Sequence, residues 1–306
     1  MKRFWNRMIK KENGNAIVLV ALAMGGMIAL TGLVIDGGHL FMNKSHLQKT
    51  ANAAALSGAQ ELVNEETAVT TVVDEVLDAH GEAESLLHAT IDSDRLLLVE
   101  LKRDVPLFFS SLFGVEHLPV SAEAKAGINP MGETKGAVPL GIDESVELIY
   151  GNTYELKVDA GDSEAGNFGV LALEGPGAKS YEDSLTHGFD ENLKVGDVIN
   201  TQTGNIAGAT RRGIDFRINE CPNPEGNLQM RDCERIMKVI VYKPEEQATN
   251  QLKSVRITGF AYFYVTERMG QNVDSIQGVF IRRAGDGTAG GEGTPDRGAY
   301  AIRLME

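Results

Sequence analysis

The stretch that decides the fold is "GNAIVLVALAMGGMIALTGLVIDGGHLFMNKSHLQKTANAAALSGAQEL", residues 14–62. It begins as an apolar run and continues as a polar, alanine-rich segment. No charged residue lies between Ala16 and Ile35. At about 1.5 Å of rise per residue this run is about 30 Å long, which is the thickness of the hydrocarbon core of a bilayer. We therefore expect a transmembrane helix over residues 16–35.

A basic segment precedes the apolar run. Residues 1–15 contain five basic residues and one acidic residue, Glu12; the basic ones are Lys2, Arg3, Arg7, Lys10 and Lys11. The positive-inside bias keeps such a segment in the cytoplasm. We therefore expect a cytoplasmic N-terminus at 1–15 and an extracytoplasmic location for everything after Asp36.

A cleaved signal peptide is the alternative to a retained anchor. The apolar run is longer than that of a signal peptide, and His39 and Phe41 are large where a cleavage site needs small residues. A prepilin-type leader is a second alternative, because Gly14 precedes the run. The acidic residue that pseudopilins carry five positions later is replaced by Leu19. We expect an uncut anchor.

Small residues recur along one side of the helical pattern. Ala21, Gly25 and Ala29 are spaced by four within the apolar run, and the residues after Asp36 keep a spacing of three or four as far as Leu62. A small-xxx-small face lets a neighbouring helix approach closely. We expect a stalk helix over 36–63 whose helix-packing residues are Ala51, Ala54 and Gly58. The simpler alternative is that Gly and Ala are merely common in membrane helices.

Four elements of this stretch carry a resemblance to a known family. They are the Gly before the apolar run, Asp36-Gly37-Gly38 at its outer end, Leu47-Gln48, and "ANAAALSGA" at 51–59. Together they resemble the N-terminal membrane module of TadG-like proteins, in the TadE/TadG group of Flp (tight-adherence) pilus assembly. A looser similarity extends to about Gly127. The resemblance implies a membrane-anchored accessory or minor component without catalytic residues. The Asp-x-Ser-x-Ser motif of a von Willebrand factor A domain is absent.

The next segment predicts a small α+β domain over 64–128. Residues 65–80 have the pattern of an amphipathic helix, 85–91 and 95–105 read as strands, 106–114 as a short helix that begins with Pro, and 118–128 as extended chain. Residues 129–136, "NPMGETKG", combine Pro and two Gly with polar residues. This composition predicts a linker.

Residues 137–306 predict a β-rich domain. Short apolar runs alternate with turn residues, and none is long enough for a helix of any size. Such spacing predicts a β-sandwich or a partly closed barrel, so the fold class of the whole chain is α+β. In residues 255–266, strict alternation would place Val255, Ile257, Ala261, Phe263 and Val265 on one face and Phe260, Tyr262 and Tyr264 on the other. The three aromatic residues are a candidate contact strip, although a second sheet covers such faces more often.

The two cysteines lie in one turn-rich segment. Cys221 and Cys233 are twelve positions apart and, by the expected topology, outside the cell. A pair that encloses a short loop in an oxidising compartment favours a disulfide, and two free thiols are the alternative. No histidine lies nearby to complete a metal site.

Charge and motifs narrow the functional class. The net charge is −14, and without the five basic residues of the first eleven positions 24 basic face 43 acidic side chains, a net charge of −19. Nucleic acid is therefore not an expected partner.

An acidic cluster contains Asp159, Asp162, Glu164 and Asn167 but lacks the spacing of an EF-hand. Calcium binding by this cluster is the lesser alternative. Neither Gly-x-Ser-x-Gly nor His-Glu-x-x-His occurs. We expect no catalytic residue, no cofactor and no metal.

Two functional hypotheses follow from the sequence. The first is a single-pass membrane protein that acts by protein contacts within a Flp-type pilus-assembly or secretion apparatus. Its partners would be other pilus-assembly or pilin-like membrane proteins and, through residues 16–35, the lipid bilayer. The alternative is a tethered surface enzyme or carbohydrate-binding protein that acts on envelope polymers. The small-residue face favours the first, since a mere tether needs no close-packing face.

Overall fold

The computed structural model describes residues 15–157, 168–202, 206–222, 230, 232–248, 251–271 and 273–305. The chain divides into two compact units. Unit 1 contains residues 1–55, 73–90 and 98–124, and unit 2 contains 56–72, 91–97 and 125–306. The α+β class expected from the sequence is confirmed, because a long helix and a few short ones accompany two large sheets.

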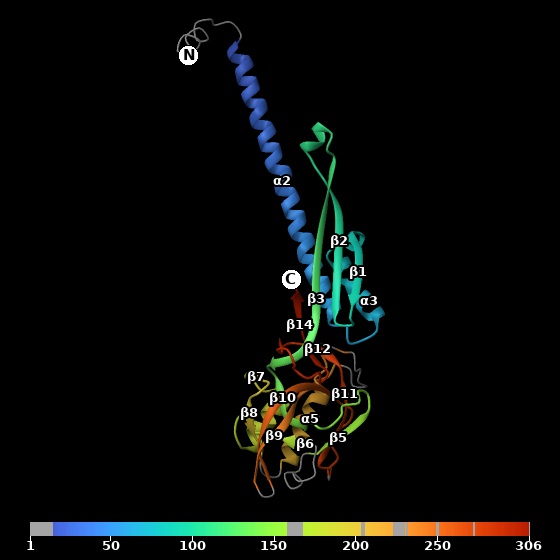
Figure 1. Ribbon diagram of the computed structural model, residues 1–306, viewed down its shortest axis with the longest axis vertical. Helices are drawn as coiled ribbons and strands as arrows, with labels where there is room; N and C mark the ends of the chain where they lie inside the picture. Colours follow the sequence, from blue (N-terminus) through green and yellow to red (C-terminus); the bar gives the residue numbers. More distant parts are fainter. Residues whose placement is uncertain are drawn as a thin grey trace. The chain divides into compact units, whose positions relative to one another are not determined.

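The first described element is a single continuous helix, α2 (Asn15–Ala59), visible in Figure 1 as the long blue ribbon. It contains 45 residues and no proline, which corresponds to a length of about 68 Å. Its buried residues begin at Gly32 and Asp36 and continue as a stripe from Leu47. Their spacing of three and four residues follows one face of a helix.

A helix and three paired strands follow α2 in the chain, and each of them has residues in both units. The helix α3 (Glu66–Ala79) and the 3₁₀ turn η1 (Ala83–Ser85) lead to β1 (Leu86–Asp92), β2 (Leu96–Pro106) and β3 (His117–Thr134), which pair in that order. β2 buries alternate residues, among them Leu97, Val99 and Leu101. Between β2 and β3, the helix expected at 106–114 is reduced to a 3₁₀ turn, η2 (Ser110–Phe113).

The linker expected at 129–136 is instead mostly strand. β3 runs without interruption to Thr134, and β4 begins at Ala137. The physical reason is that both edges of this segment are paired: Ala301 lies opposite Asn129 on one neighbouring strand, and Leu193 lies opposite Thr134 on another. Met131, in the middle, is buried. Pro130 has no N–H to offer, but its carbonyl accepts a hydrogen bond from the Gly290 amide.

Unit 2 completes the first sheet with β14 (Ala299–Met305) and β12 (Arg283–Gly285), while β7 (Leu193–Lys194) and β13 (Thr288–Ala289) also pair with β3. A second, curled sheet has the order β5-β11-β10-β9-β4-β6, and β8 also pairs with β10. Its strands are β4 (Ala137–Asp143), β5 (Thr153–Lys157), β6 (Phe168–Val170), β8 (Val198–Asn200), β9 (Ile236–Ala248), β10 (Gln251–Val265) and β11 (Ser275–Ile281).

Two helices in unit 2 were not expected from the sequence. They are α4 (Ala178–His187) and α5 (Ala207–Glu220), and residues 213–218, which look like a strand in the sequence, lie within α5. The buried residues of α5 have a clear helical spacing: Ala209, Thr210, Gly213, Ile214, Arg217 and Ile218. Because half of them are polar or glycine, apolar periodicity does not reveal the helix. Both helices pack with the second sheet in one core cluster.

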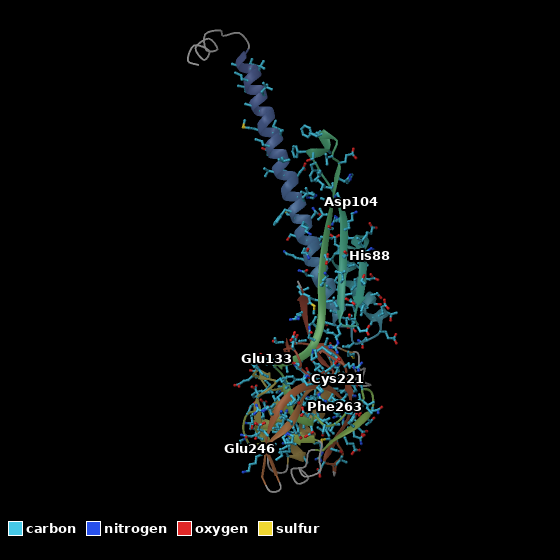
Figure 2. All side chains as sticks on the ribbon, in the orientation of Figure 1. His88, Asp104, Glu133, Cys221, Glu246 and Phe263 are labelled. Atoms are coloured by element: carbon cyan, nitrogen blue, oxygen red, sulfur yellow. A yellow bond between two sulfur atoms is a disulfide. The ribbon has the colours of Figure 1, made fainter. Side chains whose placement is uncertain are left out.

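A bulge in β10 rearranges the faces of that strand. The pairing with β9 shifts register between Ile257 and Gly259. Val255 and Ile257 therefore lie in the same core cluster as Phe260 and Tyr262, whereas Ala261, Phe263 and Val265 lie in the other. Figure 2 shows Phe263 inside unit 2. The strict alternation predicted for 255–266 is therefore wrong, because an extra residue reverses the sides of a strand.

Candidate functional site

The N-terminal part of α2 has no cover from the rest of the described chain. Every residue from Ala16 to Thr31 is exposed, and Ile17 retains 76% and Leu22 70% of its accessible surface. A continuous apolar surface of this size is unfavourable in water and typical of a segment that contacts lipid. α2 is the one helix among the described residues that is long and apolar enough to cross a membrane.

The candidate packing face of this segment is open. Ala21, Gly25 and Ala29 are all exposed, and a Cβ built on Gly25 would have no atom within 4 Å apart from the adjoining residues and the nearby backbone of its own helix. The hydroxyl of Thr31 donates to the carbonyl of Met27 at 2.8 Å, so its polar group is satisfied within the helix. A second helix could therefore approach this face closely without displacing any part of the chain.

Where the apolar run ends, Asp36 holds the tip of the β2–β3 hairpin. One carboxylate oxygen accepts hydrogen bonds from the Phe108 amide at 2.9 Å and the Phe109 amide at 3.2 Å. The other accepts from the Ser110 amide and from the Ser110 hydroxyl, both at 2.7 Å. Asp36 thereby acts as the N-terminal cap of η2 although it lies more than seventy residues away in the chain.

The position of Gly32, one turn earlier, brings the hairpin close to the helix backbone. A Cβ on Gly32 would lie 2.5 Å from Cγ of the Phe109 ring, which is closer than two atoms can approach. Gly32 is thus required for contact between helix and hairpin in this arrangement. On the other side of Asp36, the rings of His39 and Phe108 pack with centroids 5.2 Å apart.

The environment of Asp36 keeps its carboxylate charged although only 2% of the residue is exposed. Burial alone would raise the pKa of Asp36. The hydrogen bonds from Ser110, Phe108 and Phe109 outweigh this effect and lower the pKa to about 2. The carboxylate of Asp36 is therefore in its charged, accepting form at neutral pH.

The outer part of the small-residue face is covered by the chain itself. Ala51 and Ala54 have no exposed surface, and Gly58 is buried. Beside the first two, Gln48 donates to the Glu123 carbonyl of β3 at 2.6 Å, and Lys44 donates to the Ser121 carbonyl. These three small residues therefore pack within the monomer, and a partner helix has no access to them in this fold.

Comparison with known protein families shows that residues 14–61 match the model of a family described as "Putative Flp pilus-assembly TadE/G-like". The matched region is a TadE/G-like segment. It begins one residue before α2 and ends two residues after it. No curated protein and no solved structure matches the chain. The sequence resemblance drawn from the same stretch is thus confirmed for about fifty residues.

The geometry gives the TadE/G-like segment three successive surroundings. Its first part is fully exposed and apolar, its middle is bound by the hairpin at Gly32 and Asp36, and its last part lies in the protein core. The sequence indicated the first, but it gave the last part only as a stalk helix with a small-residue packing face, and it gave no indication of the middle. The sequence feature that could have indicated the middle contact is the stretch "VPLFFSSLFGV" at 105–115, which is mostly apolar and contains no charged residue.

A buried carboxylate also lies beside the TadE/G-like segment. Glu82 is 2% exposed and accepts hydrogen bonds from Arg103 at 2.7 Å and from the Ser85 hydroxyl. His46 of α2 lies 3.4 Å from the same carboxylate. A buried acid whose oxygens are occupied in this way serves to hold helix and sheet together.

In unit 2 the structure places a disulfide between Cys221 and Cys233. Both residues are buried and pack with Tyr264 and Val279. The bond joins the end of α5 to the segment before β9. Its role in the described structure is to attach a helix to the second sheet.

The candidate contact strip in β10 is not accessible. Phe260, Tyr262 and Tyr264 are at most 6% exposed, so the alternative of a covered face holds. The acidic cluster of Asp159, Asp162, Glu164 and Asn167 lies outside the described residues. Among the residues that the structure describes, no group of three or more His, Cys, Asp or Glu side chains could hold a metal ion.

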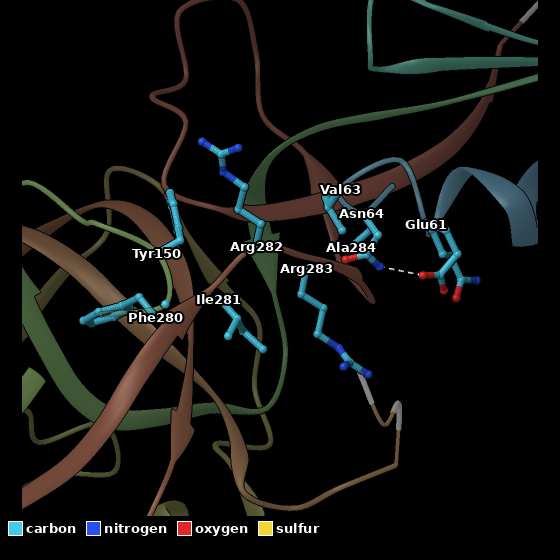
Figure 3. Close-up of a pocket in the computed structure, with 11 residues that line it drawn as sticks. Glu61, Val63, Asn64, Tyr150, Phe280, Ile281, Arg282, Arg283 and Ala284 are labelled. Carbon is cyan, nitrogen blue, oxygen red and sulfur yellow. Dashed lines mark hydrogen bonds between the residues drawn. The ribbon is translucent and has the colours of Figure 1, made fainter. Parts of the chain in front are cut away.

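A pocket of about 410 Å³ lies in unit 2 (Figure 3). Arg282 and Arg283 line it, but both are engaged: Arg282 stacks over the Tyr150 ring at 4.7 Å, and Arg283 donates to the Met230 carbonyl at 3.1 Å. Glu61, on the opposite side, accepts a hydrogen bond from Asn64. Arg282, Arg283 and Glu61 thus each make an internal contact.

Proposed function

We propose that this protein is a membrane-anchored component of a Flp pilus-assembly or related secretion apparatus and acts by contacts with other membrane proteins. The family of the TadE/G-like segment supports the pilus-assembly role. The exposed apolar helix supports a single-pass anchor. The basic residues before it support a cytoplasmic N-terminus, with both compact units outside.

One observation carries the proposal of protein contacts. The face of Ala21, Gly25 and Ala29 is the part of the small-residue pattern that the chain leaves open, and it lies in the segment expected to span the membrane. Close packing of small residues is a main source of helix association in lipid, where no hydrophobic driving force exists. We assign this face to a transmembrane helix of another pilus-assembly protein.

The proposal assigns no catalytic residue to the chain. The buried charged groups of the described residues support this view, because Glu82 and Arg217 each make internal hydrogen bonds that fix neighbouring elements. The binding role proposed here therefore differs from that of a tethered enzyme in a measurable way. It predicts that substitutions in the membrane face, and not those of single acidic residues in unit 2, impair function.

The test is complementation in the organism that encodes the protein. We expect deletion of the gene to remove or strongly reduce surface Flp fibres, counted by electron microscopy, and the wild-type gene to restore them. Gly25→Leu should restore fibres about tenfold less well, since a branched side chain separates the two helices. Ala23→Leu, on the opposite side of the same helix, is the matched control and should restore them fully. Normal piliation of the deletion strain would overturn the proposal.

Fractionation then distinguishes the two possible places in the apparatus. Fibres sheared from cells are separated from membranes, and the intact protein is followed by antibody. Recovery with the fibres would make it a minor fibre subunit. Recovery with membranes alone would make it part of the assembly platform.

A further inference from the structure

We propose that the hairpin tip, residues 105–115, enters the extracytoplasmic leaflet of the membrane beside the helix that crosses it. The inference rests on the proposed anchoring of α2. It adds a second point of contact with lipid, and one that belongs to the extracytoplasmic part of the chain.

The composition of the hairpin tip fits an apolar environment. It contains no charged residue. Its exposed side chains are large and apolar, with Leu112 retaining 80% and Phe113 79% of its surface, and Phe108 and Val115 also exposed. Isolated exposed apolar residues are ordinary, but a contiguous group at the end of a hairpin marks an interaction surface.

Both hydroxyls and most backbone amides of the hairpin tip donate hydrogen bonds within the protein. Ser110 donates its hydroxyl to Asp36, and Ser111 donates to the Phe108 carbonyl at 2.6 Å. Backbone amides along the tip also have acceptors: Leu107, Phe108, Phe109, Ser110, Leu112, Gly114 and Val115. Gly114, with φ of +85°, closes the turn by donating to Ser110 and Ser111 carbonyls. Such satisfaction is what a segment needs where no water is available.

The location of the hairpin tip identifies lipid as the occupant of its surface. Phe109 packs on Gly32, and Asp36 binds the start of η2, so the tip is fixed at the outer end of the apolar run. The exposed helix residues at this level are also apolar, namely Leu33, Val34 and Ile35. The exposed apolar residues of the hairpin tip thus lie next to those of the anchor. A bilayer that surrounds the anchor helix therefore also reaches the hairpin tip.

The test uses fluorescence quenching in vesicles. Trp5 is the single tryptophan, so Trp5→Phe gives a background in which Phe113→Trp is the one reporter. The full-length protein is reconstituted into vesicles of phosphatidylcholine and phosphatidylglycerol that contain lipid brominated near the carbonyl end, the middle or the methyl end of an acyl chain. We expect bromine near the carbonyl end to reduce the emission of the Phe113→Trp reporter by about half, and deeper bromine to reduce it less.

The control places the reporter elsewhere in unit 1. Leu87 of β1 is also exposed, and its neighbour His88 lies farther from the hairpin tip than Asp104 does (Figure 2). Leu87→Trp has the same intrinsic preference for an interface but should not be quenched by any brominated lipid. Emission from Phe113→Trp that is equally unquenched, in protein that floats with the vesicles, would overturn the inference. Protein that does not float with the vesicles would instead overturn the anchoring on which it rests.

Discussion

Asp36 is a charged residue at the end of the apolar run of α2, and it is buried. In the sequence it looks like the simple end of a membrane span. In the structure it binds three consecutive backbone amides and a hydroxyl of the hairpin tip. Because a carboxylate accepts several hydrogen bonds at once, one side chain fixes the whole start of η2.

This role makes a prediction for Asp36→Asn. The amide side chain keeps one acceptor oxygen and presents an NH₂ group to backbone N–H donors, so the start of η2 should open more often. We expect hydrogen exchange in the peptide 107–115 to become faster by about tenfold or more. The measurement is exchange followed by mass spectrometry in detergent.

Asp74→Asn is the matched control for that experiment. Asp74 is exposed on α3 in the same unit, so its substitution also removes one negative charge. Exchange at 107–115 should be unchanged in this variant. If Asp36→Asn also left the exchange at 107–115 unchanged, the packing of Phe109 against Gly32 would be enough to hold the hairpin without the carboxylate.

At the scale of the element, α2 uses small residues for two different purposes. Between Ala21 and Ala29 they leave an open face in the apolar run, and between Ala51 and Gly58 they let the core of the protein approach the helix. The sequence pattern is the same in both places, since close approach of any neighbour needs small side chains. What the pattern cannot state is whether the neighbour belongs to the same chain.

Ala54→Leu follows from the second purpose. Ala54 has no exposed surface, so three additional carbon atoms must displace packed neighbours. We expect a loss of about 1–3 kcal/mol in the free energy of unfolding, and a lower thermal midpoint measured by circular dichroism in detergent. Ala53→Leu, at a position that is only partly buried, should cost less. If the Ala54→Leu protein were fully stable but failed to assemble, the prediction would be wrong, and the face of Ala51, Ala54 and Gly58 would instead pack against another protein.

The elements predicted well are those whose burial follows a regular apolar period. The helix α3 and the strand β2 are of this kind, and their observed bounds lie within a residue or two of the expected ones. The helix α5 was missed because Arg217 occupies a core position and donates to the Leu185 and Glu234 carbonyls. A hydrogen-bonded buried charge can replace an apolar residue, and only the tertiary partners reveal it.

The local features of the candidate site could be predicted from the sequence, and its long-range contacts could not. The apolar run, its small-residue face and the disulfide pair are local features that the sequence states directly. The docking of the hairpin tip on Gly32 and Asp36 joins residues more than seventy positions apart, and nothing in the spacing of one segment indicates the other. Long-range contacts of this kind depend on the fold of the intervening strands.

At the scale of the molecule, the two compact units are interleaved in sequence and do not follow one another along the chain. Unit 2 takes residues 56–72 and 91–97 from between the pieces of unit 1. The last of the boundaries falls within β3, between residues 124 and 125, where the backbone remains in one continuous strand. A linker between successive domains is therefore replaced by a strand that is shared by both units.

Hydrogen exchange of β3 tests this arrangement. Residues 125–134 are paired with β14, β13 and β7, so their amides should exchange far more slowly than those of the loop at 144–152, which lies between β4 and β5. We expect a difference of at least about a hundredfold in rate, measured on peptides from the full-length protein in detergent. A flexible linker at 129–136 would instead exchange as fast as the loop. That result would contradict the continuous, paired strand over residues 125–134.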